Sequence, residues 1–375
     1  MPQKMLAMLG GGQLGRFFVM AAHDMGFKVS VLDPDKNSPA GKIADIHICK
    51  KYDDKSALDE IIETCSAATT EFENIPAESL DYLGKQIQVY PKAKSVHIVQ
   101  NRIREKKFLL KNLIPVGLFF EIESEVDLNQ VSQDVFPAII KIAEFGYDGK
   151  GQKKVKSQKE ALSAFNEFDK RPCVLEKQVK LDKEVSVILA RSHDGVIVTH
   201  PVAENIHING ILDTTIAPAR IDQLMEKNIT DLAKMIAFKL DFIGVMAVEF
   251  FISGNEIFVN EIAPRPHNSG HYSLDACYVS QFSQQVRTLA EMPLGNSINH
   301  SKAIMVNLLG ELWDQSESHQ PNWQEALSLE NFQLHLYGKK DPRLGRKMGH
   351  ITFTTQQEIT EELILDVRQI KENLK

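Results

Sequence analysis

The sequence predicts an α/β protein of two or three domains that opens with a parallel sheet covered by helices. Its 375 residues exceed one ordinary domain, and 43% hydrophobic with 25% charged residues is a globular balance with enough apolar side chains for a large core. At the start of the chain, apolar runs alternate with helical periodicity, which is the pattern of strands joined by helical crossovers.

A glycine turn and a helix over Gln13–Met25 follow the first strand, and Gly26 ends that helix. Asn101–Lys111 is predicted as a helix that leads to the next unit. The predicted strands of the opening unit are Lys4–Leu9, Lys28–Asp33, Ile46–Ile48 and Ala67–Glu71.

In the middle of the chain, strands outnumber helices. A helix is predicted over Gln158–Phe168 and a longer one over Ile221–Leu240. The predicted strands are Val116–Ile122, Ala138–Ala143, Cys173–Val179 and Glu184–Arg191. The residues expected on the apolar face of the longer helix are Leu224, Ile229, Leu232, Ile236 and Leu240.

Two strong strands follow that helix, Val245–Ile252 and Glu256–Ile262. Ser253–Asn255 separates them and contains a central glycine, which is a hairpin signal. The chain ends in a charged segment, Gln356–Leu374, that we expect to be a helix.

The formal charge of −7 gives the molecule as a whole no attraction for nucleic acid or for an anionic membrane. No stretch approaches the roughly 20 apolar residues that span a bilayer. The four cysteines are far apart and form no C-x-x-C pair, which indicates a reducing compartment and speaks against a zinc or disulfide framework. We therefore expect a cytoplasmic protein with neither nucleic acid nor membrane as a partner.

The turn from Gly10 to Gly15 reads G-x-G-x-x-G between a strand and a helix, and Asp33 closes the second strand. This is the dinucleotide fingerprint in its usual context, so an NAD-dependent dehydrogenase is one alternative. The other is a tight turn that lines a site for a different ligand. Nothing later in the sequence indicates a hydride-transfer pocket.

Glu249 and Glu261 are the most informative pair of residues. If the chain reverses at Asn255, the two glutamates lie directly opposite each other, about 5 Å apart. Their neighbours are mostly apolar, so burial adds to the repulsion, and either a proton or a cation must relieve it. Oxygen ligands suit Mg²⁺. A one-residue slip in register, or the paired carboxylates of a glycosidase, are the alternatives.

The loop Gly146–Gln152 supplies phosphate-binding features. Its three glycines can present backbone amides to phosphate oxygens, and Lys150 adds a positive charge. Lys141 lies on the preceding strand and can reach the same phosphates. Glu176–Val179 begins polar and ends apolar, which suits the edge of an adenine.

The order of these features resembles the ATP-grasp superfamily. More specifically, the chain resembles the 5-(carboxyamino)imidazole ribonucleotide synthase family, the ATPase subunit type of phosphoribosylaminoimidazole carboxylase. The resemblance extends over nearly the whole chain, and Asn260–His271 is its most specific motif. The segments that carry it are Gly10–Gly15, Glu71–Pro76, Gly146–Gln152, Asn260–His271 and Arg346–His350. Ala143 and Phe145 stand where the family usually has a basic residue and a second glycine.

This resemblance implies a three-domain ATP-grasp fold with a Rossmann-like N-terminal sheet, and usually a homodimer. The implied domains are residues 1–100, a lid domain at 101–183, and a C-terminal domain at 184–375 that carries the metal site. It also implies a ligase of purine biosynthesis that uses ATP with Mg²⁺ and carboxylates 5-aminoimidazole ribonucleotide with bicarbonate.

The resemblance also implies four groups of site residues. ATP would be bound by Arg102, Lys141, Gly146, Tyr147, Asp148, Gly149, Lys150, Gly151, Gln152, Glu176, Lys177, Gln178, Val179, Glu184, His207, Asn260 and Glu261. Mg²⁺ would lie on Glu249 and Glu261. The nucleotide substrate would meet Gln13, Glu73, Arg265, His267, Asn268, Ser269, Lys339 and Arg346. Catalytic roles would fall to Lys141, Tyr147, Asp148 and Arg265.

The residues support a mechanism in which bicarbonate attacks the γ-phosphate of ATP and a closed site protects the resulting carboxyphosphate. Asp148, the acid within the loop, is a candidate to accept the proton of the amine; the alternative is a turn-forming aspartate. Arg265, Lys339 and Arg346 are candidates for the 5′-phosphate. A glycinamide ribonucleotide formyltransferase, which uses formate, or a biotin carboxylase would share the ATP-binding residues. An ATP-binding regulatory module is a further alternative.

Overall fold

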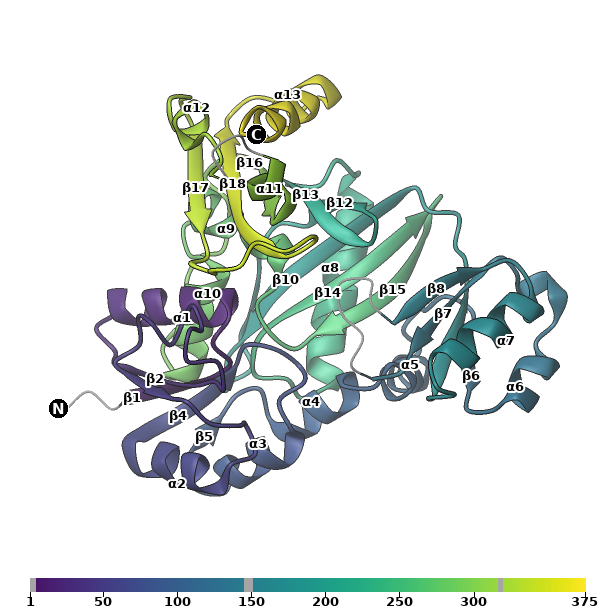
Figure 1. Cartoon of the computed structure of the whole chain (residues 1–375), viewed down its shortest axis with the longest axis horizontal. Coiled ribbons are helices and arrows are strands. Elements are labelled where there is room, and N and C mark those ends of the chain that lie inside the picture. The colour runs from purple at the N-terminus through teal and green to yellow at the C-terminus, as the bar shows by residue number, and fades with distance from the viewer. Residues whose placement is uncertain (1–4, 145–150, 316–319) are drawn as a thin grey trace.

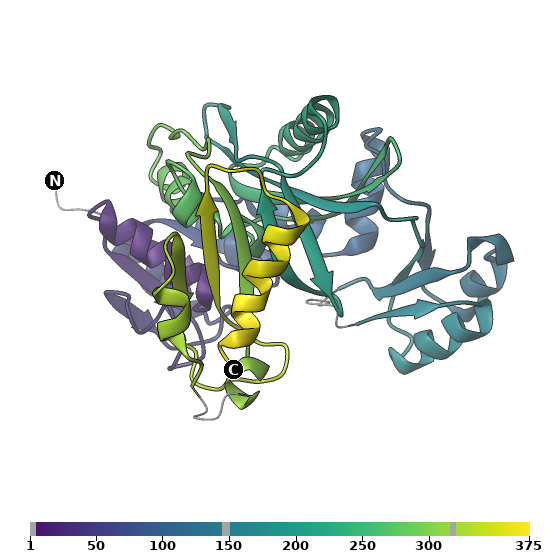
Figure 2. The same ribbon diagram turned by 90° about the horizontal axis from the view of Figure 1, so that it is seen from above.

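Three sheets organise the computed structural model, which describes residues 5–144, 151–315 and 320–375 (Figure 1). One is parallel and contains the N-terminal strands. The second is a small antiparallel sheet in the middle of the chain, and the third is a large antiparallel sheet formed by the second half. The second unit projects from the rest of the molecule (Figure 2).

The N-terminal sheet has the strand order β3-β2-β1-β4-β5, and every pairing in it is parallel. Alternate side chains of β1 enter two cores: Leu6 and Met8 pack with helix α1, whereas Ala7 and Leu9 pack with α2 and α3. The predicted parallel sheet with helices on it is confirmed. Its elements are β1 (Met5–Leu9), α1 (Gln13–Asp24), β2 (Val29–Leu32), β3 (Ile46–Ile48), α2 (Lys55–Thr64), β4 (Cys65–Thr70), α3 (Ala77–Gly84), β5 (Gln88–Val89) and α4 (Ala93–Val99).

The middle unit is a four-stranded sheet in the order β6-β9-β7-β8. Helices α6 and α7 pack on it around Phe165, which is fully buried. Helix α5 leads into this unit, and Asn101 caps it by accepting hydrogen bonds from the amides of Ile103 and Arg104. The elements are α5 (Arg102–Lys111), β6 (Phe119–Ile122), α6 (Glu125–Gln130), β7 (Ala138–Ile142), β8 (Gln152–Val155), α7 (Gln158–Glu167) and β9 (Cys173–Lys177).

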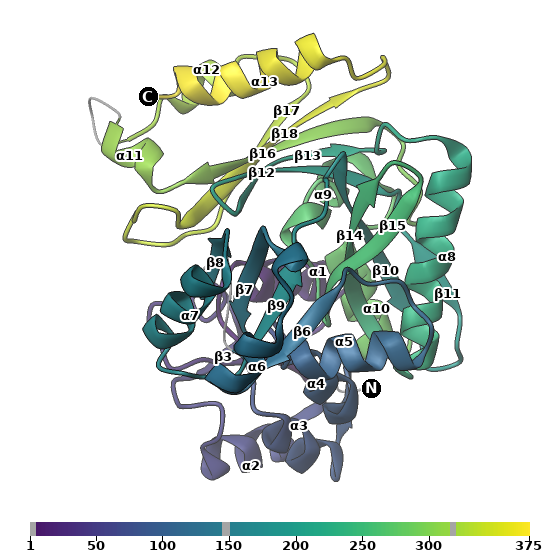
Figure 3. The same ribbon diagram turned by 90° about the vertical axis from the view of Figure 1, so that its right-hand side faces the viewer.

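The C-terminal sheet has the order β15-β14-β10-β12-β13-β16-β18-β17, with β11 paired to β10. Helix α8 covers β10 and β14, and α13 packs on β16 at the other end of the sheet (Figure 3). Its strands are β10 (Lys183–Arg191), β11 (Ile197–Thr199), β12 (Ala203–Ile208), β13 (Ile211–Ala217), β14 (Gly244–Ser253), β15 (Glu256–Ala263), β16 (Lys302–Leu309), β17 (Phe332–Leu336) and β18 (Lys347–Thr355). Its helices are α8 (Gln223–Lys239), α9 (Ser273–Ala276), α10 (Gln281–Leu289), α11 (Glu311–Gln315), α12 (Trp323–Leu327) and α13 (Glu361–Asn373).

Helix α10 joins the large sheet to the N-terminal unit. It packs against α1, with the rings of Phe17 and Phe282 centred 4.9 Å apart. Gln285 on the same helix donates hydrogen bonds to Thr69 Oγ1 and to the carbonyl oxygen of Thr70, at the end of β4. Because α10 also packs on β10 and β14, these contacts bring the glycine turn and the residues after β4 close to that part of the large sheet.

Two details differ from the sequence prediction. Leu224 was expected on the buried face of α8 but is 68% exposed, because it lies in the first turn and well to one side of the stripe that contains Ile229 and Ile236. The last helix begins at Glu361 rather than near Gln356, since Thr360 caps it by accepting a hydrogen bond from the amide of Leu363. Among the helices that the structure describes, none combines the length and apolar character needed to cross a membrane.

Candidate active site

Strands β14 and β15 place Glu249 directly opposite Glu261, so the predicted register is confirmed. A bulge follows at once, because Phe250 pairs with Val259 and leaves Asn260 as the extra residue. Asn260 Nδ2 donates a hydrogen bond to Glu249 Oε2 at 3.2 Å. Its own amide oxygen is buried and has no hydrogen-bond partner among the described residues. Three side chains with oxygen ligands therefore gather at one point of the hairpin.

The two glutamates differ in their charge partners. Arg102 Nη1 lies 2.9 Å from Glu261 Oε2, and this cation holds the pKa of Glu261 below its ordinary value although burial acts in the opposite direction. Burial and then the charge of Glu261 raise the pKa of Glu249. Arg102 thus compensates the charge of Glu261, whereas the charge of Glu249 is left repelled by Glu261. A divalent cation fits this group, since two carboxylates and a free amide oxygen are the ligands that Mg²⁺ prefers.

On the other side of this group, Lys141 and Glu176 lie on adjacent strands β7 and β9. Lys141 Nζ is 3.1 Å from Glu176 Oε2, and both side chains are buried. Burial lowers the pKa of Lys141, while Glu176 acts in the opposite direction. The charge of Lys141 also lowers the pKa of Glu261, so the lysine and the carboxylate pair belong to one electrostatic site.

Two neighbouring strands add Glu184 and His207. His207 Nδ1 lies 2.6 Å from Glu184 Oε2, and this carboxylate raises the pKa of the imidazole although burial opposes it. Glu249 also raises the pKa of His207, so the pair lies within the field of the carboxylates. Seven of the predicted ATP-binding residues thus converge here from the middle sheet, the large sheet and α5: Arg102, Lys141, Glu176, Glu184, His207, Asn260 and Glu261. Gly151 and Gln152 are placed at the start of β8, and Lys177, Gln178 and Val179 at the end of β9. Gly146, Tyr147, Asp148, Gly149 and Lys150 lie outside the described residues.

The predicted nucleotide-binding residues form a second group beside the first. Arg265 Nε is 2.6 Å from Glu73 Oε2, which links the segment after β15 to the segment after β4. His267 lies 3.4 Å from Glu249 through Nε2, and burial followed by the charge of Arg265 lowers its pKa to about 3, so its imidazole is neutral near pH 7. The two groups therefore share a border at Glu249.

Asn268 and Ser269 are anchored rather than free in this arrangement. Asn268 Nδ2 donates to Asn307 Oδ1 at 3.1 Å, and the hydroxyl groups of Ser269 and Ser186 lie 2.7 Å apart. Both serve to fix the turn that carries His267. Lys339 donates to the carbonyl oxygen of Lys347 at 2.7 Å, and its charge reaches Glu71.

Gln13 and Arg346 complete the predicted group, and they lie on two further elements. Gln13 begins helix α1 directly after the glycine turn. Arg346 Nη1 donates to the carbonyl oxygen of Asp341 at 2.8 Å, within the loop that joins β17 to β18. Their part in substrate binding stays a prediction.

The glycine turn is occupied by the chain's own carboxylates. Asp33 Oδ2 accepts a hydrogen bond from the amide of Gly11 at 2.7 Å. Glu71 accepts hydrogen bonds from the amides of Gly12 and Leu14, the second at 3.0 Å. These amides, at the start of α1, are the ones that a dinucleotide pyrophosphate would need. The turn therefore fastens the end of β4 to the start of α1. Because its amides are already bonded, it does not offer the pyrophosphate site that a dehydrogenase would need.

Sequence reasoning missed two residues of α5. Lys106 is only 2% exposed in its side chain, and its Nζ lies 3.4 Å from Glu176 Oε1. Glu105 is buried, and its burial raises its pKa to about 8. The spacing from Arg102 was the available signal for Lys106, since residues four apart on a helix share a face. Glu176 is thus held between two lysines.

Three stretches of the chain match known families. Residues 3–100 match the ribonucleotide synthetase preATP-grasp domain, residues 107–282 the ATP-grasp domain, and residues 303–362 the phosphoribosylaminoimidazole carboxylase C-terminal domain. Together they cover all three sheets.

Relatives match over almost their full length. The N5-carboxyaminoimidazole ribonucleotide synthase of Bacillus subtilis is 40% identical over 359 residues, which cover 95% of this chain and 93% of that protein. The Staphylococcus aureus N5-carboxyaminoimidazole synthetase complexed with ADP has a TM-score of 0.90 at 35% identity, with 98% and 97% of the chains covered. The Aspergillus clavatus N5-carboxyaminoimidazole synthase, in complex with ADP and 5-aminoimidazole ribonucleotide, has a TM-score of 0.90 at 29% identity, with 99% and 98% covered.

Proposed function

This chain belongs to the N5-carboxyaminoimidazole ribonucleotide synthase family of ATP-grasp ligases, and on that premise we propose that it uses ATP, Mg²⁺ and bicarbonate to carboxylate the amine of 5-aminoimidazole ribonucleotide. As a family member it is an ATP-dependent enzyme of purine biosynthesis. One observation carries the proposed chemistry: Glu249 and Glu261 face each other beside the unpaired amide oxygen of Asn260.

In this proposal, Glu249, Glu261 and Asn260 hold the metal ion. Mg²⁺, when bound, offsets the charge of the phosphate oxygens during transfer. Lys141 and Arg102 supply positive charge to the same phosphates, and this charge is more effective because both cations are largely shielded from solvent. Glu176 is fixed by Lys141 and Lys106 at the base of the site, where the strand end Lys177–Val179 meets the adenine.

Bicarbonate attacks the γ-phosphate and forms carboxyphosphate, with ADP as the leaving group. Carboxyphosphate then breaks down to carbon dioxide and phosphate, and the amine of the nucleotide captures the carbon dioxide. Because water would destroy the intermediate, the loop Gly146–Gln152 is proposed to close over it. Asp148 accepts the proton that the amine releases, and Tyr147 lies next to it in the loop.

ADP release measured with bicarbonate or with formate, each alone, with 5-aminoimidazole ribonucleotide and with biotin, tests the function. We expect release to require bicarbonate and to rise when the nucleotide is present. If formate replaces bicarbonate, the chain is a formyltransferase, and if only biotin stimulates release, it is a biotin carboxylase. Either result would overturn the proposal.

Replacing Asp148 by asparagine should lower kcat by about 10²-fold, the lower range for loss of a general base, with little change in nucleotide affinity. Steady-state kinetics and equilibrium binding measure the two effects. Asp169→Asn, at an exposed turn of the same unit, is the matched control and should retain activity. Near-normal turnover of Asp148→Asn would leave Asp148 a turn residue only.

Removal of the Arg346 side chain should weaken phosphate binding. We expect Arg346→Ala to raise KM for the nucleotide by about 10-fold, the size of one charge-assisted hydrogen bond, with KM for ATP nearly unchanged. Arg343→Ala is the control, because Arg343 lies in the same loop and is 74% exposed in its side chain. Equal effects on both substrates would contradict the assignment.

We also propose a homodimer in the cytoplasm. The family resemblance supports the dimer, and the four unpaired cysteines fit a reducing compartment. Light scattering of the purified protein measures the oligomeric state, and a monomer at micromolar concentration would contradict it.

A further inference from the structure

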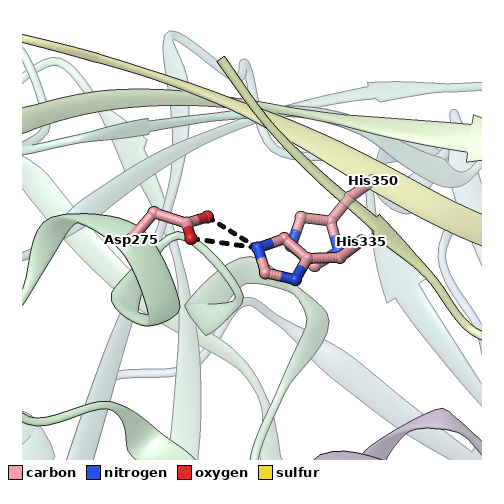
Figure 4. Close-up of side chains that lie close together, drawn as sticks. All are labelled: Asp275, His335 and His350. Atoms are coloured by element: carbon pink, nitrogen blue, oxygen red, sulfur yellow. Dashed lines mark hydrogen bonds and ion pairs between the residues drawn. The ribbon is translucent and has the colours of Figure 1, made fainter. Parts of the chain in front are cut away.

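A second cluster of ligand-type side chains, which shares no residue with the Glu249–Glu261 pair, lies where α9 faces β17 and β18 (Figure 4). It consists of Asp275, His335 and His350, one from each element. A ligand atom from each residue lies within 4.8 Å of the other two. Asp275 and His335 are half-buried and His350 is buried, so the cluster lies at the border between core and solvent.

His335 directs its Nε2 at the carboxylate of Asp275, 3.0 Å from each oxygen. Its ring stacks on that of His350, with centroids 4.6 Å apart and 22° between the planes. Figure 4 shows both rings on the same side of the Asp275 carboxylate. Nε2 of His335 and the two carboxylate oxygens of Asp275, all possible metal ligands, therefore already face each other, and the imidazole of His350 lies alongside.

His350 contributes a nitrogen that the protein leaves unused. Its Nδ1 lies 2.9 Å from the hydroxyl of Tyr337, whereas its Nε2 is buried and has no hydrogen-bond partner in the described part of the chain. A buried polar atom without a partner costs free energy. In metal sites, a ligating histidine commonly has its other ring nitrogen held by a hydrogen bond, as Tyr337 holds Nδ1 here. His350 thus has the surroundings of a metal ligand.

We propose that Asp275, His335 and His350 bind a divalent transition-metal ion, for which Zn²⁺ is the probe, through one carboxylate oxygen and the two Nε2 atoms. Two imidazoles and a carboxylate are a ligand set typical of Zn²⁺ and its neighbours, with a remaining position for water. The chemistry differs from that of the Glu249–Glu261 pair, which offers oxygen ligands alone. The site shares no residue with the proposed Mg²⁺ site.

Ion binding requires a small movement of one ring. Tetrahedral Zn²⁺ with bonds of 2.0–2.1 Å places its ligand atoms roughly 3.4 Å apart, whereas these atoms lie within 4.8 Å of one another, so the widest pair must approach by up to about 1.4 Å. The near-parallel rings must also turn relative to each other, because both Nε2 lone pairs have to point at the ion. His335 can make this adjustment, since it lies on the edge strand β17 and its side chain is 23% exposed. A bound ion would join α9 to β17 and β18.

Zn²⁺ titration of the chelator-treated full chain tests the site, by calorimetry and by thermal unfolding, with Co²⁺ absorption in the visible range as a report on nitrogen ligation. We expect one tight site and a rise in melting temperature. Asp275→Asn and His350→Gln should each weaken Zn²⁺ binding by about 100-fold or more. Loss of a residue that only supports a metal ligand already costs about 10–100-fold, and these two residues are proposed as ligands themselves. His193→Gln, at an exposed position, is the matched control and should bind as the wild type does.

Glu249→Gln separates the two sites, because Zn²⁺ uptake should persist in it if the ion lies on Asp275, His335 and His350. The proposal is overturned if the wild type does not bind Zn²⁺. It is also overturned if Glu249→Gln loses Zn²⁺ binding while Asp275→Asn and His350→Gln retain it. If either of those variants is unfolded without metal, His335→Gln replaces it, since His335 lies at the edge of the sheet. Wild-type affinity in His335→Gln would equally overturn the proposal.

Discussion

We expect Glu249→Gln to lower kcat by about 10³-fold, because it removes one of the two charges that we propose hold the metal ion. Loss of that ion costs several kcal/mol of transition-state charge stabilisation, and each 1.36 kcal/mol is a factor of ten in rate. ADP release over a range of Mg²⁺ concentrations measures the effect. Glu256→Gln, an exposed residue on the same hairpin, is the control and should leave kcat unchanged.

The same substitution should stabilise the protein when Mg²⁺ is absent. Because the pKa of Glu249 is raised in the folded state, the folded protein holds a proton that the unfolded chain releases near pH 4.3. Folding stability of the metal-free wild type therefore falls as the pH rises from that value towards the raised pKa, and the penalty is complete above it. Glu249→Gln removes the penalty, so its advantage in melting temperature should grow over this range. A variant that is less stable than the wild type at every pH would show that the two carboxylates do not repel each other.

Glu261→Gln makes a useful comparison, because the two glutamates have different partners. Glu261 neutralises Arg102, whose guanidinium would be left without its 2.9 Å partner. We therefore expect loss of activity without any gain in stability. A gain in stability from Glu249→Gln but not from Glu261→Gln, at two opposed positions of one hairpin, follows only if Arg102 makes the pair asymmetric.

The hairpin was predictable because its determinants are local. Gly254 and Asn255 fix the reversal, and an alternating pattern then sets which residues oppose one another. The bulge after Glu249 was not predictable in the same way, yet it is the feature that turns Asn260 towards the carboxylates. The reaction and the identity of the nucleotide came from the family resemblance, since no spacing of residues specifies them.

Other parts of the site depend on contacts between segments that are distant in sequence. The glycine turn resembles a dinucleotide site in the sequence alone. In the folded chain, Glu71, which follows β4, accepts the hydrogen bonds of its amides instead. Asp275 and His335 are 60 residues apart, and no local pattern joins them. The burial of Lys106 could not be predicted for another reason. A lysine on a charged helix is usually solvated, and the pairing with Glu176 is what makes its burial favourable.

Arg265→Met should be the most destabilising single change at the site, with a cost of about 3–5 kcal/mol, because it leaves the Glu73 carboxylate without its cation. The side chains of Arg265 and Glu73 are only 17% and 23% exposed, and they come from units 192 positions apart. Arg265 lowers the pKa of Glu73 against the effect of burial. The stability from the pair is therefore present above the ordinary carboxyl pKa of about 4.3 and is lost as the pH falls through the lowered value. Chemical denaturation at pH 7 and at low pH measures the difference.

A double-mutant cycle separates the contribution of the Arg265–Glu73 pair from any other effect of replacing Arg265 on stability. Glu73→Gln in the Arg265→Met background should recover much of the loss, because it removes the uncompensated charge. Glu361→Gln breaks a surface contact with Arg220, in which Glu361 is 77% exposed, and should cost less than about 1 kcal/mol. If Arg265→Met costs no more than this surface control, the pair does not join the two units. The double variant should still fail to bind the nucleotide, since removal of the charge restores the fold but not the arginine that we propose meets the substrate.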